Sequence, residues 1–177
     1  AISIAYPITN LTLALSVGLG VGINSLMARS LGAGNEKKAR KAASTYLFCS
    51  IFHYLLFVIL GLIIIPFFFN CFTKNEEIIR LGKEYLAILL FLCLGQQIHI
   101  AIEKIFQAHG KMAVGMIAQC LGCAVNIALD ALFIYVFKMG VAGAAIATVI
   151  GQFLSCIYIF IIGLRDKYIS LNFKELI

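Results

Sequence analysis

The stretch that decides the fold runs from Asn126 to Thr148 and reads NIALDALFIYVFKMGVAGAAIAT. It joins the end of a mostly apolar run, Met112 to Phe137, to the start of a second one, Val141 to Leu164. The break between them, Lys138 to Gly140, is three residues long. An apolar run of about 20 residues is what a membrane-spanning helix requires. The stretch therefore predicts two antiparallel membrane helices that turn back at Gly140.

Three oxygen-bearing side chains interrupt these two runs. Asp130 lies eight residues before Lys138 and Thr148 lies eight residues after Gly140. At a rise of ~1.5 Å per residue, both lie roughly 12 Å from the turn. Asn126 is four residues before Asp130, one helical turn deeper on the same face. The pattern predicts a cation site that is formed by Asn126, Asp130 and Thr148.

A carboxylate within the bilayer costs ~2.5–3.5 kcal/mol on insertion scales, so Asp130 must pair, take up a proton or bind a cation. The two runs hold no Lys or Arg at its depth, which favours proton or Na⁺ binding over a salt bridge. Na⁺ is the only metal ion that we expect here, and Asn126 and Thr148 would supply neutral oxygen ligands for it. The alternative is a protonated Asp130 that donates a structural hydrogen bond between helices.

The composition fits a membrane protein. Of 177 residues, 62% are hydrophobic and 12% are charged, and the mean hydropathy is +1.01. The net charge is +6, and the basic residues lie between the apolar runs, as topology determinants do. This distribution argues against nucleic-acid binding. No nucleophile or metal set lies at matched depth, so no enzyme and no cofactor are expected. The pair Cys120 and Cys123 has metal-like spacing but no second pair, which favours plain packing.

The fold class that follows is all-α, a polytopic membrane helix bundle. We expect five spans, separated by a basic loop at Ala28 to Ser44, a mixed-charge loop at Thr73 to Glu84, and two short turns. Within the basic loop we expect a helix end at Gly32 or Gly34 and then a short surface helix. The spans are Ile2 to Met27, Thr45 to Phe72, Tyr85 to Phe106, Met112 to Phe137, and Val141 to Leu164.

Further polar residues predict a cavity beside the cation site. Gln119 precedes Asn126 by seven residues, and Gln152 follows Thr148 by one turn. Along the third span, polar residues recur at helical spacing, which indicates one face toward protein or water. That face either lines the cavity or lies close to the loop, and the sequence leaves both open. Its members are Gln96, His99, Glu103 and Gln107.

Lys and Arg distribute unequally between the two ends of these spans. Ten lie in the first loop, the third turn and the tail, and four lie at the opposite end. Because positive charge favours the cytoplasm, the first loop and the C-terminus are expected there, with the turn at Gly140 outside. The ten are Arg29, Lys37, Lys38, Arg40, Lys41, Lys104, Lys111, Arg165, Lys167 and Lys174; the four are Lys74, Arg80, Lys83 and Lys138.

With these features in place, the sequence resembles the multidrug and toxic compound extrusion (MATE) family of antiporters. The resemblance runs through essentially the whole chain and is carried by four segments. They are GVGINSLMARSLGAGNEKKARKA (Gly20 to Ala42), FQAHGK (Phe106 to Lys111), Asn126-x-x-x-Asp130, and GVAGAAIAT (Gly140 to Thr148).

The resemblance implies a twelve-helix fold of two six-helix lobes. Residues 1–164 would be helices two to six of the N-terminal lobe, and residues 165–177 the start of a cytoplasmic inter-lobe linker. The first helix, which supplies a further Asp to the family's site, and the C-terminal lobe would belong to the rest of the parent chain. The family's cation ligands on helices five and six match Asn126, Asp130 and Thr148.

The implied function is export of drugs and other cationic or amphipathic compounds across the plasma membrane in exchange for Na⁺ or H⁺. The implied partners are small-molecule substrates and membrane lipids. Two alternatives stay open. One is a lipid-linked oligosaccharide flippase of the same superfamily, which should have a larger and more basic cavity. The other is a membrane scaffold that transports nothing.

Overall fold

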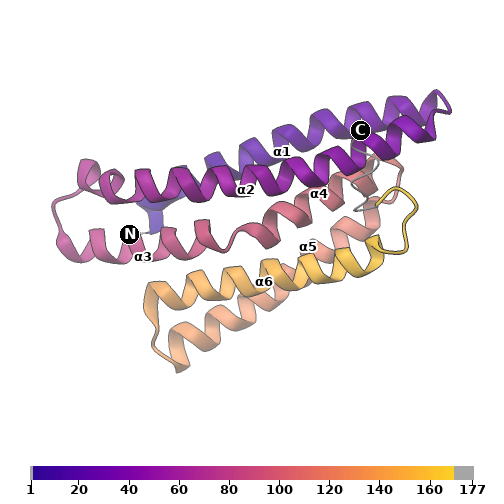
Figure 1. Cartoon of the computed structure of the whole chain (residues 1–177). Coiled ribbons are helices and arrows are strands. Elements are labelled where there is room, and N and C mark those ends of the chain that lie inside the picture. Colours follow the sequence, from indigo (N-terminus) through magenta and orange to yellow (C-terminus); the bar gives the residue numbers. More distant parts are fainter. Residues whose placement is uncertain (1, 170–177) are drawn as a thin grey trace.

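The computed structural model describes residues 2–169, and this part of the chain is a bundle of antiparallel helices without strands (Figure 1). This confirms the all-α membrane bundle. The elements, in order, are α1 (Ile2–Gly32), α2 (Glu36–Phe72), α3 (Glu76–Phe91), α4 (Leu94–Ala108), α5 (Met112–Ala131), the π-helical turn η1 (Leu132–Val136) and α6 (Gly140–Gly163).

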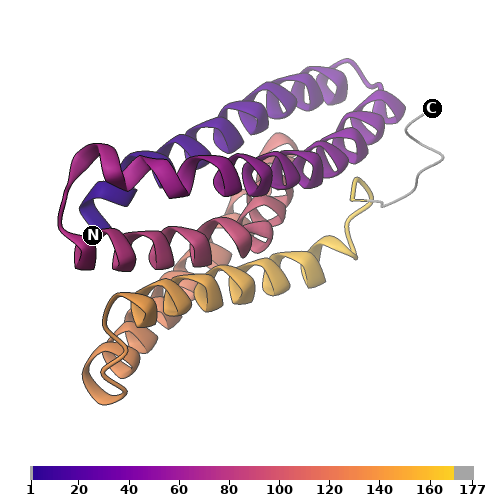
Figure 2. The same ribbon diagram turned by 60° about the vertical axis from the view of Figure 1, so that its left-hand side comes forward.

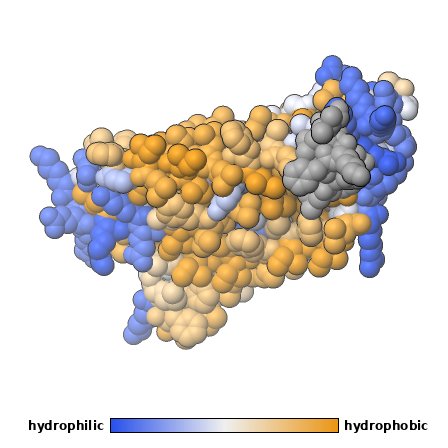
Figure 3. Space-filling model, viewed as in Figure 1, coloured by the Kyte–Doolittle hydropathy of each residue, from blue (hydrophilic) through white to orange (hydrophobic). Residues whose placement is uncertain are grey.

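Four helical stretches are long and apolar enough to cross a membrane: α1, α2, α5 with η1, and α6. The third predicted span is wrong as a single helix. It is the pair α3 and α4, which bends by 46° at the break after Phe91, and counting this pair as one span gives five. Figure 3 shows an apolar belt over these helices with hydrophilic residues at both ends.

The predicted basic loop, Ala28 to Ser44, is largely helical. α1 does end at Gly32, and Gly34 adopts a positive φ of 70°. The separate surface helix is wrong, because Glu36 already begins the 37-residue α2. Asn35 caps this start by accepting a hydrogen bond from the backbone N–H of Lys38 at 3.0 Å. Alanines in the first turns of α2 are buried against Met27, which extends the helix well past the apolar run.

The predicted loop Thr73 to Glu84 is also mostly helix. Asn75 accepts hydrogen bonds from the backbone N–H groups of Glu77 and Ile78 at 3.0 and 3.1 Å, so α3 begins at Glu76. An amphipathic first turn that carries two glutamates extends the helix beyond the apolar part.

The ends of the helices form two groups (Figure 1). One end of the bundle holds the α1–α2 turn, the α4–α5 turn and the end of α6, and the other holds the α2–α3 turn and the Lys138–Gly140 turn. Figure 2 shows the same grouping from the side. Within residues 2–169, the loops that were assigned to a common side from their charge therefore do lie together, while Lys174 lies outside the described residues.

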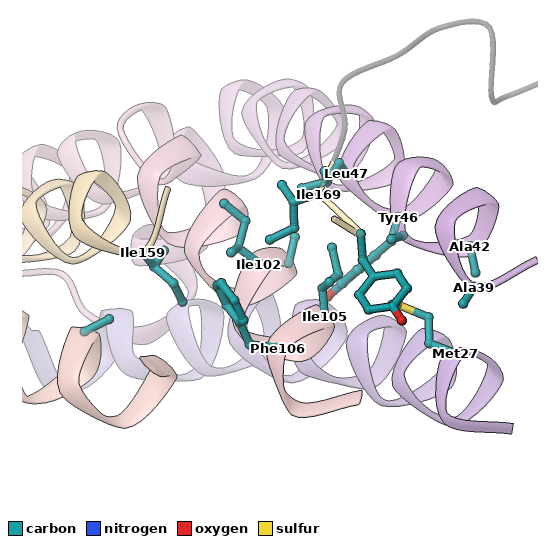
Figure 4. Packing of buried hydrophobic residues seen from close by; sticks show 14 residues of the cluster. Met27, Ala39, Ala42, Tyr46, Leu47, Ile102, Ile105, Phe106, Ile159 and Ile169 are labelled. Atoms are coloured by element: carbon teal, nitrogen blue, oxygen red, sulfur yellow. The ribbon is translucent and has the colours of Figure 1, made fainter. Parts of the chain in front are cut away.

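The main hydrophobic core lies toward the end that holds the α1–α2 turn. It joins α1, α2, α4 and α6 to the segment after α6, and Phe106 and Ile105 are almost fully buried in it (Figure 4). Tyr168 and Ile169 of that segment belong to the same cluster. A smaller cluster around Phe69 and Leu86 fixes α3 against α2 near the opposite end. Both clusters hold the helices that surround the polar interior.

The segment after α6 is also fixed by a buried carboxylate. The Asp166 side chain is 2% exposed, and its oxygens accept hydrogen bonds from Lys111 Nζ at 2.7 Å and from the Tyr168 N–H at 3.0 Å. His109 Nε2 lies 3.1 Å from Asp166 Oδ2. Burial alone would raise the pKa of Asp166, but these hydrogen bonds and the charges of His109 and Lys111 outweigh it, so the pKa lies below its ordinary value. The ion pair between Lys111 and Asp166 attaches the residues after α6 to the α4–α5 turn.

Replacing Asp166 should cost stability in a pH-dependent way. Since its pKa is lower in the folded state, the carboxylate stabilises the fold above its unfolded pKa of ~3.9, and this contribution disappears as the pH falls through the folded pKa. Asp166→Asn in the full-length protein should cost about 1–3 kcal/mol at neutral pH and nothing in strong acid. Thermal unfolding in detergent measures both.

The matched control is Lys167→Ala. Lys167 Nζ binds Glu36 Oε1 at 2.7 Å, but the two side chains are 55% and 49% exposed, so this pair should contribute little. Equal losses of stability in Asp166→Asn and Lys167→Ala would contradict the role of Asp166.

Candidate cation site

Helices α5 and α6 approach each other through two glycines. A Cβ atom on Gly122 would lie 2.8 Å from the carbonyl oxygen of Gly151, and a Cβ on Gly151 would lie 2.7 Å from the carbonyl oxygen of Gly122. Only a hydrogen atom fits at either position, so the two backbones are in direct contact. One turn away, Ser155 Oγ donates a hydrogen bond to the Ala118 carbonyl at 2.9 Å. The small residues thus fix the register of the two helices.

This register places Asn126 opposite Thr148. Asn126 Nδ2 lies 3.4 Å from Thr148 Oγ1, across the two helices. The Thr148 hydroxyl donates to the carbonyl oxygen of Ala144 at 2.9 Å, which leaves its lone pairs as acceptors. An amide and a hydroxyl of the predicted trio are therefore neighbours.

Asp130 lies one helical turn nearer to the Lys138–Gly140 turn than this pair. Its Oδ1 atom is buried and has no hydrogen-bond partner among the described residues. Because this oxygen is buried, the carboxylate is directed toward the bundle, and it interacts electrostatically with Tyr85 of α3. Counting residues from the turn put Asp130 level with Thr148. The π-helical turn Leu132–Val136 spaces its residues differently from an α-helix, and Asn126 is the residue opposite Thr148 instead.

A cavity of about 420 Å³ opens beside Asn126 and Thr148, between α1, α4, α5 and α6. All four residues that the sequence analysis placed in a cavity wall line it: Gln96, His99, Gln119 and Gln152. Two buried polar atoms in this wall, His99 Nε2 and Gln152 Oε1, have no hydrogen-bond partner in the described part of the chain. Of the two interpretations of the polar face on α4, the structure favours the cavity wall.

A second, smaller cavity adjoins the first. Its volume is about 230 Å³, and it shares Gln96, Thr148 and Gln152 with the larger one. It reaches toward Tyr85 and Tyr6, the side on which Asp130 lies. Thr148 is thus accessible from both cavities, while Asp130 lines neither.

Two features of the site were missed in the sequence. Glu103 lines the large cavity, although it was noted only as a member of a polar face. Tyr85 lies close to Asp130, although it was expected only as the first residue of the third span. The four-residue spacing between His99 and Glu103 could have indicated that Glu103 lines the same cavity. Nothing in the sequence indicated that Tyr85 of α3 interacts electrostatically with Asp130.

Chemically, the site offers a carboxylate, an amide and a hydroxyl in a helix bundle with an apolar exterior. Oxygen ligands of this kind suit a hard cation, and an isolated carboxylate in such surroundings also takes up a proton. Among the described residues, no group of three or more His, Cys, Asp or Glu side chains is placed to hold a metal ion.

Comparison with known proteins gives a consistent result. A family model described as MatE matches residues 1–132. The multidrug export protein MepA of Staphylococcus aureus (strain NCTC 8325 / PS 47) is 25% identical over 178 aligned residues, which cover 98% of this chain and 39% of MepA. The chain therefore spans about two fifths of the length of this relative.

Two solved structures of a multidrug resistance MATE family transporter of the MOP superfamily have the same fold. The inward-facing one matches with a TM-score of 0.92 at 29% identity and covers 98% of this chain and 40% of its own. The outward-facing one also matches with a TM-score of 0.92 at 29% identity, and covers 99% of this chain and 40% of its own. The described fold is therefore equally similar to both conformations.

Proposed function

This chain belongs to the MatE family of membrane transporters, and from that premise we propose that the full-length protein is a cation-coupled antiporter. It would export drugs and other cationic or amphipathic organic compounds in exchange for Na⁺ or H⁺. Residues 1–164 would be part of its N-terminal lobe and residues 165–177 the start of the linker to the second lobe. The protein would lie in the plasma membrane, and the charge distribution supports a cytoplasmic location of its first loop.

The observation that carries this proposal is the Asp130 carboxylate, which lies one helical turn from the contact between Asn126 and Thr148. It has a buried oxygen without a partner, within a helix that is apolar enough to span a membrane. Ionisable residues in such positions usually belong to ion pathways. The Asn126–Thr148 contact supplies neutral ligands one turn away.

Coupling follows if the ion binds one conformation better than the other, because a ligand shifts an equilibrium only by its differential affinity. The equal similarity of this fold to an inward-facing and an outward-facing structure supports a lobe that moves largely as one body. Asp130 and the cavity would then be exposed to either side of the membrane in turn, while their internal geometry is kept.

The proposal is tested by reconstituting the full-length protein in liposomes and following the dye ethidium, a lipophilic cation. We expect ethidium to move against its gradient when either a Na⁺ gradient or a pH gradient is imposed, with the effective gradient identifying the ion. Liposomes without a gradient serve as the control. Absence of ethidium movement under both gradients, with transport of a lipid-linked sugar instead, would overturn the proposal in favour of a flippase.

A further inference from the structure

The wall of the large cavity holds two titratable groups that the proposed cation site does not use. His99 and Glu103 are four residues apart on α4, so their side chains are neighbours on one face of the helix, and both line the cavity. Burial of the His99 ring disfavours its charged form, and the nearby Glu103 carboxylate favours it. His99 is 4% exposed, and its Nε2 atom has no hydrogen-bond partner among the described residues.

The position of Glu103 is fixed by its surroundings. A Cβ atom on Gly115 would lie 2.6 Å from Glu103 Cγ, so the glycine on α5 makes room for the base of this side chain. Gln107 Nε2 donates to Glu103 Oε1 at 2.6 Å, and Lys104 Nζ lies 3.9 Å from the same oxygen. Both contacts hold the Glu103 carboxyl in place beside His99.

We infer that His99 is a proton-binding site in the cavity wall, with the Glu103 carboxylate as its counter-charge. An imidazole whose Nε2 lacks a partner has a lone pair that can accept a proton, and the imidazolium so formed lies beside a fixed negative charge. The site is separate from Asp130, which does not line this cavity. The inference extends the proposed antiport. Proton binding by His99 does not depend on that proposal, but its consequence for transport does.

Few other groups face this pair. Lys104 is the charged neighbour on α4, Tyr46 of α2 interacts electrostatically with Glu103, and Cys123 is the titratable residue that α5 adds to the cavity wall. The residues that α1 and α6 contribute to this wall are uncharged. A positive charge on His99 is therefore balanced chiefly by Glu103.

The consequence for transport is competition between charges. A proton on His99 adds positive charge to the wall of the cavity, so an organic cation in the cavity and this proton should disfavour each other. By linkage, the effect is reciprocal, and cation binding should release the proton. His99 would then couple proton uptake to substrate release independently of the ion at Asp130.

The direct test is a pH titration of the histidine NMR signals of the full-length protein in detergent, with ¹³C-labelled histidine. The His99 signal is identified by its loss in His99→Gln, or by its loss in His99→Asn if His99→Gln does not fold. We expect the His99 signal to titrate while the protein stays folded. Glu103→Gln should lower its midpoint, because a neighbouring negative charge favours the protonated imidazole.

Ethidium and a second histidine provide the controls. Added ethidium should lower the midpoint of His99, and His53→Gln should leave it unchanged, since His53 is buried on α2 and does not line the cavity. A His99 signal that stays neutral at every pH, or a midpoint that does not change in Glu103→Gln, would overturn the inference. Neither outcome depends on Asp130, so failure of the antiport proposal would be recognised separately.

Discussion

Asp130→Asn in the full-length protein is expected to slow ion-driven export of ethidium strongly and to leave ethidium binding largely intact. The amide has nearly the shape of the carboxylate but neither its charge nor its capacity to take up a proton, so the site can no longer distinguish its loaded and empty states. Coupling free energies of about 1–3 kcal/mol correspond to roughly 5–150-fold effects, and the initial rate under an imposed gradient should fall within that range.

The measurement is ethidium efflux from liposomes under the gradient that drives the wild-type protein. Glu84→Gln, which removes an exposed carboxylate on α3, is the control and should behave as wild type. Unchanged coupled export by Asp130→Asn would show that the carboxylate binds no coupling ion. It would then favour the alternative of a protonated Asp130 in a structural hydrogen bond.

Gly122→Ala is expected to destabilise the protein and to impair the cation site at the same time. The added methyl group would meet the Gly151 carbonyl oxygen, a backbone atom that cannot move aside without separating α5 from α6. Overpacking of this kind costs about 1–3 kcal/mol. Because the same contact sets the register of Asn126 and Thr148, ion binding should weaken together with stability.

Thermal unfolding of the full-length protein in detergent measures the first effect, and an ion titration measures the second. Gly22→Ala on α1 is the matched control, since its Cβ would meet nothing within 4 Å. Alanine has the higher helix propensity, so this variant should be as stable as wild type or slightly more stable. A Gly122→Ala protein as stable as Gly22→Ala would contradict the proposed helix contact.

The sequence predicted those parts of the fold that depend on hydrophobic length and local turn chemistry. The hairpin around Gly140, the turn before Met112 and the end of α1 at Gly32 follow from apolar runs interrupted by glycine. The family resemblance is confirmed by the match of the MatE model to residues 1–132.

Other parts depend on contacts between distant segments and could not be predicted from the sequence. The first turns of α2 are polar in sequence but are helical because their alanines are buried against α1 and α4. The break between Phe91 and Leu94 contains neither proline nor glycine, and Gly95, the nearest glycine, lies within α4. The register of α5 against α6 depends on Gly122 and Gly151, whose contact a residue count from the turn does not reveal.

The candidate site divides in the same way. Its residue types were evident from Asp130, Asn126 and Thr148 within apolar runs, and the cavity-wall glutamines from their helical spacing. The electrostatic interaction of Tyr85 with Asp130 and the position of Asn126 beside Thr148 both result from helix packing. Whether these residues bind an ion stays a prediction.

Direct ion binding tests the central claim most simply. Na⁺ is titrated into the full-length protein in a calorimeter, and proton uptake is followed with a pH indicator, for wild type, Asp130→Asn and Thr148→Val. We predict that the wild-type protein binds one of these ions, that Asp130→Asn loses this binding, and that Thr148→Val binds about tenfold more weakly, a difference of ~1.4 kcal/mol. Equal ion binding by all three proteins would contradict a cation site at Asp130.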